Sequence, residues 1–191
     1  MSDQTLTRRK PVHPGEHGLS RRREEMIRVD HAGEFGAVQI YRGQRAVFDR
    51  LPSKAHASAL LADMEAGEKI HLETFDRMVR DRNVRPTAMA PIWRLGGFML
   101  GAATALLGEK AAHACTAAVE EVIEKHYADQ AVELADDDPE LKATILKFRE
   151  EEIEHKNTAL QEGAEQAVGY PLLSAAIKLG CRVAIKVSEK I

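Results

Sequence analysis

Apolar residues recur at helical spacings along the chain from Arg23 onward. Spacings of three, four and seven residues place side chains on one helix face, and alternating runs of β-branched residues bounded by turns are missing. The pattern predicts an all-α domain over 23–191. Long helices are expected over 23–50, 54–80, 109–135 and 139–163, with an apolar segment over 93–107 and a last helix after Pro171.

Prolines and capping residues mark the expected helix ends. Pro52 cannot lie inside a helix, and Ser53 is expected to cap the helix that follows. Asp138 suits the N-cap of the fourth long helix, because Pro139 then lies in its first turn. Long helices joined by short turns in two pairs favour an up-down bundle, with the apolar segment linking the pairs.

Residues 1–22 differ from the rest of the chain. They are polar, carry basic runs at 8–10 and 21–23, and lack the apolar stretch of a secretory signal. We therefore expect a flexible N-terminal tail. A mitochondrial presequence is the competing interpretation, which Asp3 and Glu16 disfavour.

Composition narrows the class of protein. The 191 residues are 44% hydrophobic, which is enough for one domain with a substantial core. The 27 basic and 30 acidic side chains leave a net charge of -3, so nothing indicates a nucleic-acid partner. Cys115 and Cys181 are too far apart for a C-x-x-C pair, and a disulfide framework is not expected.

Ionisable residues interrupt the apolar faces of the first two long helices. Glu34 shares its face with Ile27 and Val38. In the second helix, Glu68 and His71 are three positions apart and lie on a stripe of apolar residues, namely Leu61, Met64, Leu72 and Phe75. We expect all three polar side chains to point into the core.

The second half of the chain repeats this arrangement. Glu120 lies on an apolar face of the third long helix, and Glu152 and His155 are again three apart on the fourth. These residues follow their counterparts at nearly constant offsets, 86 positions for Glu34 and 84 each for Glu68 and His71.

Two neighbours compete with Glu120 for its place in the repeat, Glu121 and Glu124. Tyr127 follows Glu120 by seven positions, just as Tyr41 follows the corresponding glutamate of the first helix. This match favours Glu120.

Four carboxylates and two imidazoles would destabilise an apolar core, because an unpaired buried carboxylate costs several kcal/mol. Two divalent cations would balance about four negative charges, with neutral imidazole completing each shell. Mixed carboxylate and imidazole ligation suits iron or manganese, and this distribution over four helices is typical of di-iron bundles. We predict a two-metal site whose ligands are Glu34, Glu68, His71, Glu120, Glu152 and His155.

Other interpretations stay open for individual residues. Glu-x-x-His pairs also form exposed salt bridges on helices. His31 lies on the side of Glu34, where a hydrogen-bonded histidine is commoner than a ligand. Tyr41 and Tyr127 suit core packing and a role beside the metals equally well. Two glycines flank Glu34 and weaken its helix by roughly 1 kcal/mol each, which suggests the close approach of a helix or ligand (Gly33 and Gly36).

Two segments favour a membrane surface. Residues 95–107 carry no charge but are too short to span a bilayer, so a buried core segment and an interfacial segment are both open. In the last helix, Lys178, Arg182 and Lys186 lie four apart along one edge. Such a helix favours an anionic bilayer over an ordinary solvated face.

Four motifs resemble the demethoxyubiquinone hydroxylase family, the 3-demethoxyubiquinol 3-hydroxylases of the Coq7 or Cat5 type. They are R-V-D-H-A-G-E-F-G-A at 28–37, the two Glu-x-x-His pairs, A-C-T-A-A-V-E-E-V-I-E-K-H-Y at 114–127 and F-R-E-E-E-I-E-H at 148–155. The resemblance covers 24–190, without departure at the six ligand positions. It implies a ferritin-like four-helix bundle with a di-iron centre and additional apolar and amphipathic helices.

The same resemblance implies roles for individual residues. Glu34, Glu68 and His71 would serve one iron, and the second set of three would serve the other. Glu68 and Glu152 would bridge the two ions. His126 and Tyr127 match an H-Y element of the family, which implies that they neighbour the quinone.

The implied activity is that of a di-iron monooxygenase in ubiquinone biosynthesis. It would use O2 to hydroxylate the ring of 2-polyprenyl-3-methyl-6-methoxy-1,4-benzoquinol, with NADH as the source of electrons, although no Gly-rich nucleotide-binding loop is visible. The expected location is peripheral, on the cytoplasmic face of a bacterial membrane or the matrix side of the mitochondrial inner membrane. The implied partners are the polyprenyl quinone, the membrane, a second copy of the chain and an accessory lipid-binding protein of the pathway.

Two other functions are open. A rubrerythrin-like peroxide scavenger usually carries a cysteine-rich rubredoxin module, which two distant cysteines cannot form. A ferritin-like iron-storage protein has a polar outer surface, which the apolar segment over 95–107 and the basic last helix disfavour.

Overall fold

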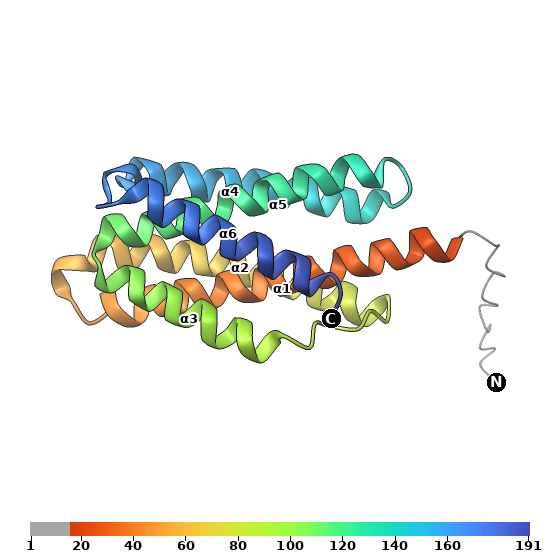
Figure 1. The fold of residues 1–191 in the computed structure, drawn as a ribbon, viewed down its shortest axis with the longest axis horizontal. Coiled ribbons are helices and arrows are strands. Elements are labelled where there is room, and N and C mark those ends of the chain that lie inside the picture. Colours follow the sequence, from red (N-terminus) through yellow and green to blue (C-terminus); the bar gives the residue numbers. More distant parts are fainter. Residues whose placement is uncertain (1–15) are drawn as a thin grey trace, which may run out of the picture.

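The computed structural model describes residues 16–191, with side chains from Arg21 onward. These residues form six α-helices and no strand, which confirms the all-α prediction (Figure 1). The helices are α1 (Glu16–Phe48), α2 (Ala55–Asp81), α3 (Ala90–Leu106), α4 (Glu109–Leu134), α5 (Pro139–Gln161) and α6 (Tyr170–Ser188), with 3₁₀ turns at Pro52–Lys54 and Ala164–Gln166.

The first helix begins at Glu16, earlier than residue 23 where it was expected. The basic run at 21–23 therefore belongs to α1. Arg22 forms ion pairs with Glu133 of α4 at 2.8 Å and with Glu189 after α6 at 3.0 Å, so contacts distant in the sequence stabilise this end of the helix. Of the tail predicted over 1–22, residues 1–15 lie outside the described residues, and the prediction is wrong for 16–22, which are helical.

One of the two predicted caps is confirmed. Asp138 accepts a hydrogen bond from the backbone N–H of Leu141 at 3.1 Å, with Pro139 in the first turn of α5. The prediction for Ser53 is wrong, because Lys54 occupies the N-cap of α2 and no side chain caps it. Pro52 starts the 3₁₀ turn, and its fixed φ suits that position, so Ser53 is already inside the turn.

The helices form two similar sets of three. α1 packs against α2 and α4 packs against α5, while α3 covers α1 and α6 covers α4. In Figure 1 all six run along the long axis of the molecule. α6 is thus the counterpart of the apolar segment, which extends the repeat beyond the four helices that carry the predicted ligands.

Glycines let α3 lie directly against α1. A Cβ on Gly101 would overlap the carbonyl oxygen of Ile40, and one on Gly43 would overlap that of Phe98. A Cβ on Gly33 or Gly36 would meet nothing within 4 Å, but α3 comes close to the backbone of Gly36, since a Cβ on Gly97 would lie 2.9 Å from its carbonyl oxygen.

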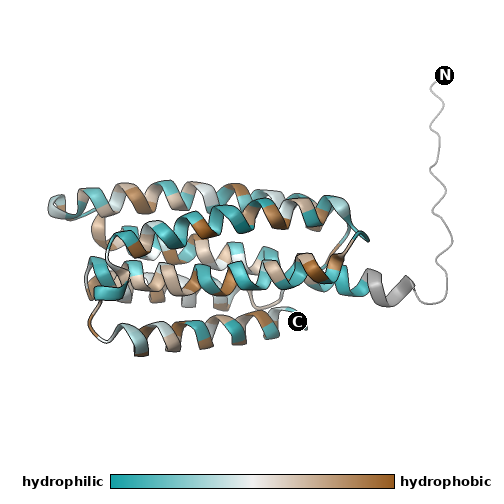
Figure 2. Ribbon diagram, turned by 90° about the horizontal axis from the view of Figure 1, so that it is seen from above, coloured by the Kyte–Doolittle hydropathy of each residue, from teal (hydrophilic) through white to brown (hydrophobic). Residues whose placement is uncertain are grey.

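The segment over 95–107 is both packed and exposed. One face of α3 lies on α1, whereas Leu95, Met99 and Leu106 are 66%, 56% and 75% exposed. Hydrophobic and hydrophilic positions alternate along the helices (Figure 2). Among residues 16–191, no helix is long and apolar enough to cross a membrane.

Candidate metal centre

The six predicted ligands come together between α1, α2, α4 and α5. They form two groups that share two members: Glu34, Glu68, His71 and Glu152 in one, and Glu68, Glu120, Glu152 and His155 in the other. Within each group, one potential ligand atom per residue lies within 4.8 Å of the others. The shared members, Glu68 and Glu152, are those expected to bridge. All are buried except His155, which is partly exposed.

The centre lies between two apolar clusters of the core. One contains Met26, Phe75 and Tyr127, and the other contains Tyr41 and Leu61. The helical stripes that predicted inward-facing carboxylates thus also supply the apolar walls on both sides. Water is excluded from most of the site, because four of the carboxylates are at most 1% exposed.

Two tyrosines connect the halves of the repeat. The Tyr41 hydroxyl donates to Oε1 of Glu120 at 2.7 Å, and the Tyr127 hydroxyl donates to Oε1 of Glu34. Each tyrosine therefore holds the glutamate of the opposite half. Both hydroxyls are buried, so the two alternatives proposed for these residues, core packing and a place beside the ligands, are met together.

His71 is held from three sides. Its Nδ1 lies 3.2 Å from Oε1 of Glu152 and 3.4 Å from Oε2 of Glu34, so this nitrogen faces the carboxylates. Its Nε2 lies 2.6 Å from Glu151, and its ring stacks on Phe148 at 3.9 Å. A carboxylate on the far nitrogen orients an imidazole ligand and makes it more basic.

His155 is the corresponding residue of the second half. Its Nδ1 lies 3.0 Å from Oε1 of Glu68 and 3.5 Å from Oε2 of Glu152. Gly67 of α2 lies next to the ring, since a Cβ there would be in van der Waals contact, at 3.4 Å, with two of its atoms. The spacing of three residues in each Glu-x-x-His pair therefore brings both side chains to the same centre.

Burial dominates the acid–base properties of the centre. It raises the pKa of Glu34 well above its ordinary value, and it does the same for Glu120, helped by the charges of Glu152 and Glu68. Burial alone would raise the pKa of Glu68 too, but a hydrogen bond with His155 and the nearby ring of His71 lower it to about 2.

The two histidines respond in the opposite direction. Burial disfavours the imidazolium form of His155, but the nearby carboxylates of Glu152 and Glu68 raise its pKa to about 10. The nearby carboxylates of Glu152, Glu34 and Glu68 likewise outweigh burial at His71 and raise its pKa strongly. Protons thus neutralise the clustered carboxylates wherever no cation does.

Unpartnered atoms show that this centre fits cations. Oε2 of Glu34, Glu68 and Glu120, both carboxylate oxygens of Glu152 and Nδ1 of His71 are buried without a hydrogen-bond partner. Buried polar atoms are normally paired, and oxygen and imidazole nitrogen are the donors that suit iron. The set can hold two divalent ions with near-neutral total charge.

The other candidates of the sequence lie outside the centre. His31 pairs with Asp76 at 2.9 Å, which confirms its interpretation as a hydrogen-bonded residue. Glu121 pairs with Lys178 at 2.6 Å and Glu124 with Lys156, so both point away from the ligands. Cys115 and Cys181 are free.

His126 is partly exposed and contacts Asp30 and Gln130. The spacing argument had singled out neither of these two residues, nor Glu151. Asp30 stands in the R-V-D-H-A-G-E motif, and Glu151 directly precedes a ligand, but helical periodicity gives no signal for a hydrogen-bonding role.

The structure contains an apolar cavity of about 480 Å³. α1, α3, α4 and α6 line it, mostly with small or aliphatic side chains, and Gly33 and Gly36 are among them. The α1 and α4 wall includes Ala37 and Val119, which stand close in sequence to Glu34 and Glu120. His126 and Tyr127 do not line the cavity, so their predicted place beside a quinone stays a prediction.

Known proteins similar to this chain are named as hydroxylases of demethoxyubiquinol or demethoxyubiquinone. Residues 21–188 match the family model "Ubiquinone biosynthesis protein COQ7". A "3-demethoxyubiquinol 3-hydroxylase" from Rhodospirillum rubrum is 51% identical over 178 residues, which cover 93% of this chain and 82% of that protein.

Mitochondrial proteins match over a similar range. The "NADPH-dependent 3-demethoxyubiquinone 3-hydroxylase, mitochondrial" of Homo sapiens is 46% identical over 172 residues, covering 88% of this chain and 77% of that protein. The "5-demethoxyubiquinone hydroxylase, mitochondrial" of Saccharomyces cerevisiae is 39% identical over 184 residues, with 88% and 78% covered.

Proposed function

The chain belongs to the COQ7 family of ubiquinone biosynthesis proteins, and from that premise we propose that it is the oxidoreductase that hydroxylates the ring of demethoxyubiquinol. The relatives are named hydroxylases in both bacterial and mitochondrial forms. These names do not favour the two alternative functions, iron storage and peroxide scavenging. The observation that carries the proposal is the buried set of four glutamates and two histidines on four helices.

The metal proposed for this set is iron. Two bound iron ions would supply the redox chemistry by which O2 is reduced and one oxygen atom is inserted into the ring. The chain's own residues prepare the site for it. Glu151 and Phe148 fix the ring of His71, and Tyr41 and Tyr127 each hold one oxygen of a ligand glutamate.

The apolar cavity supports a polyprenyl substrate. Its wall of aliphatic side chains and glycines suits a prenyl chain, and we propose that the ring lies at the α1 and α4 side, on the helices that carry Glu34 and Glu120. α3 and α6 contribute to the cavity and also expose large apolar residues on the surface, Leu95 and Leu179 among them. A quinone could thus pass between a bilayer and the cavity without entering water.

The same surface supports a peripheral membrane location. Arg182 and Lys186 are exposed on α6 beside Leu179 and Val183. Apolar side chains and cations together bind an anionic bilayer. The proposed location is the cytoplasmic face of a bacterial membrane, with the matrix side of the mitochondrial inner membrane as the alternative. The other proposed partners are a second copy of the chain and an accessory lipid-binding protein.

The electron donor is proposed to be a reduced nicotinamide nucleotide. Several relatives are named NADPH-dependent, whereas the family resemblance implied NADH. Turnover with each nucleotide, measured in parallel, decides between them.

Complementation tests the proposed function. In a strain that accumulates demethoxyubiquinone, the wild-type chain should restore ubiquinone, and Glu152→Ala should not, because both oxygens of Glu152 face the metal site. Glu154→Ala is the control, since Glu154 is exposed on the same helix. Iron should bind at about two ions per wild-type chain, and clearly less in Glu152→Ala. Restoration by Glu152→Ala as well would remove this site from the mechanism.

A further inference from the structure

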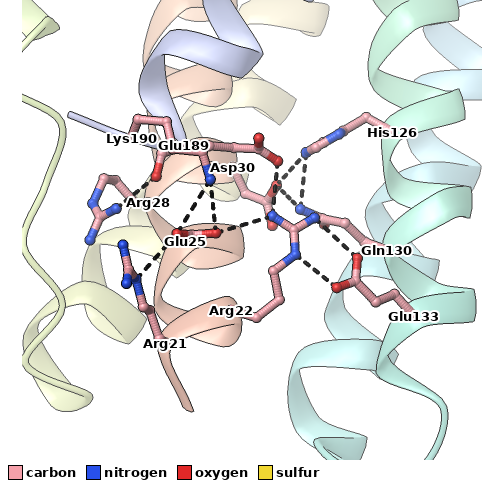
Figure 3. A network of polar contacts seen from close by, with 10 residues as sticks. All are labelled: Arg21, Arg22, Glu25, Arg28, Asp30, His126, Gln130, Glu133, Glu189 and Lys190. Atoms are coloured by element: carbon pink, nitrogen blue, oxygen red, sulfur yellow. Dashed lines mark hydrogen bonds and ion pairs between the residues drawn. The ribbon is translucent and has the colours of Figure 1, made fainter. Parts of the chain in front are cut away.

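A second polar cluster lies one helical turn before Glu34. Asp30 of α1 is 2% exposed, and its Oδ1 accepts a hydrogen bond from Nε2 of Gln130 at 2.9 Å. Nε2 of His126 lies 3.3 Å from the same oxygen (Figure 3). Oδ2 of Asp30 is buried without a partner. A carboxylate is expensive to bury in this way, so a role beyond packing is indicated.

The contacts of His126 suit an imidazole that gains and loses a proton. Its Nε2 faces two groups of opposite character, the amide nitrogen of Gln130 at 2.9 Å and the Asp30 carboxylate. A neutral ring can accept from the amide through this nitrogen, and a protonated ring can donate to the carboxylate. Each form of the ring therefore has one of these two groups as a partner.

The other half of the repeat lacks such a pair. At the offset of 86 positions that relates Glu34 to Glu120, Asp30 corresponds to Thr116 and His126 to Ile40. Gln130 corresponds to Gln44, which donates to the backbone carbonyl of Ala112 at 3.0 Å. Neutral residues at the two corresponding positions are thus compatible with the fold of the bundle. The pair of ionisable residues occurs only at Asp30 and His126, in one of the two equivalent places.

The pair joins the interior to the surface. His126 is 16% exposed at its side chain, and the next residue, Tyr127, donates to Glu34. The charged groups around the pair are Arg22 of α1 and Glu133 of α4, which bind each other at 2.8 Å, and Glu189 beyond α6, which pairs with Arg22 (Figure 3). Burial raises the pKa of Asp30 although His126 and Gln130 hydrogen-bond to it.

We infer that Asp30 and Gln130 are positioning residues that hold His126 as the group through which protons pass between solvent and the Glu34 end of the metal centre. The inference rests on the proposed hydroxylase function. One turnover converts the ring C–H bond to C–OH and reduces the second oxygen atom of O2 to water. It consumes a hydride, that is two electrons and one proton, from the nicotinamide nucleotide and one further proton from solvent, and His126 carries protons only.

Asp30→Asn tests the role of the carboxylate. The amide keeps the shape and an acceptor for Gln130, but a protonated His126 loses its anionic partner. Because that loss matters most where few protons are available, kcat should fall about tenfold at pH 8.5 and only two- to threefold at pH 6. Thr116→Val, at the corresponding position of the other half, is the matched control and should retain the wild-type pH profile.

Two measurements separate positioning from a structural effect. Bound iron and the melting temperature of Asp30→Asn should stay near the wild-type values, which a loss of the site would change. His126→Ala should lose activity, and free imidazole should restore part of it, because the vacated position is partly open to solvent.

The outcomes are distinguishable. A wild-type chain that turns over no demethoxyubiquinol would overturn the proposed function itself. An active wild type with an Asp30→Asn profile parallel to its own, or a His126→Ala chain that imidazole does not rescue, would overturn the inference. Should Asp30→Asn not fold, the imidazole experiment alone decides.

Discussion

At the scale of single residues, the burial of the ligand carboxylates depends on partners from the opposite half of the chain. Tyr41 donates to Glu120 and Tyr127 donates to Glu34, so each half is completed only when the two are packed together. A buried carboxylate oxygen that loses its donor costs roughly 1–3 kcal/mol, which makes these bonds part of the folding free energy as well as of the site.

The raised pKa values predict that metal binding releases protons. In the metal-free chain the pKa values of His71, His155, Glu34 and Glu120 are all raised, which favours their protonated forms. These groups must lose their protons to act as ligands, so the binding of two ions should release protons and should weaken as the pH falls.

Calorimetry checks this prediction. Anaerobic titration with Fe²⁺ in two buffers of different ionisation enthalpy gives the number of protons released, and repeating it at pH 6 gives the direction of the pH dependence. His155→Ala, which removes a group with a pKa of about 10, should release fewer protons. Equal heats in both buffers would contradict the assignment.

At the scale of helices, the contact of α3 with α1 requires glycine. Gly101→Ala should push α3 away from Ile40, because the added Cβ would overlap backbone atoms, which cannot move aside as a flexible side chain can. The free energy of unfolding should fall by about 1–3 kcal/mol. Gly96→Ala on the same helix is the control. A Cβ there meets nothing within 4 Å, so the higher helix propensity of alanine should leave stability unchanged or raise it by up to about 1 kcal/mol.

Denaturant unfolding of both variants measures the difference. Equal changes in the two would mean that helix propensity, not the contact between helices, sets the effect. Activity should follow the same order, since α3 also lines the apolar cavity.

At the scale of the whole molecule, the exposed apolar residues of α3 and α6 predict binding to anionic vesicles. Leu95→Gln with Leu179→Gln should weaken binding about tenfold, which corresponds to about 1.4 kcal/mol. Val132→Gln is the control, because Val132 is 82% exposed on α4, outside this surface. Co-sedimentation with vesicles at low and high salt separates the apolar from the electrostatic contribution to binding. High salt should weaken the electrostatic contribution, which comes from Arg182 and Lys186.

An equal loss in the Val132 variant would contradict this assignment of the surface. Binding that is insensitive to salt would instead remove the basic residues from it.

The sequence by itself determined the helices and the six residues that meet at the centre. Helical spacing is a local property, so an inward-facing glutamate shows itself among apolar neighbours, and the shared spacing of seven residues to a tyrosine distinguished Glu120 from Glu121 and Glu124. The cap at Asp138 was equally local. The cap assigned to Ser53 was wrong because a 3₁₀ turn begins at Pro52 and α2 begins only at Ala55, and the local sequence does not show which of these two Ser53 would precede.

Only the tertiary structure decided which residues complete one another across helices. The exchange of tyrosines between halves, the contact of Glu151 with His71 and the cluster of Asp30, His126 and Gln130 join residues 79 to 100 positions apart. The same is true of the cavity between α3 and α6. Distances between side chains on different helices depend on how the helices pack, and periodicity along one helix carries no information about that.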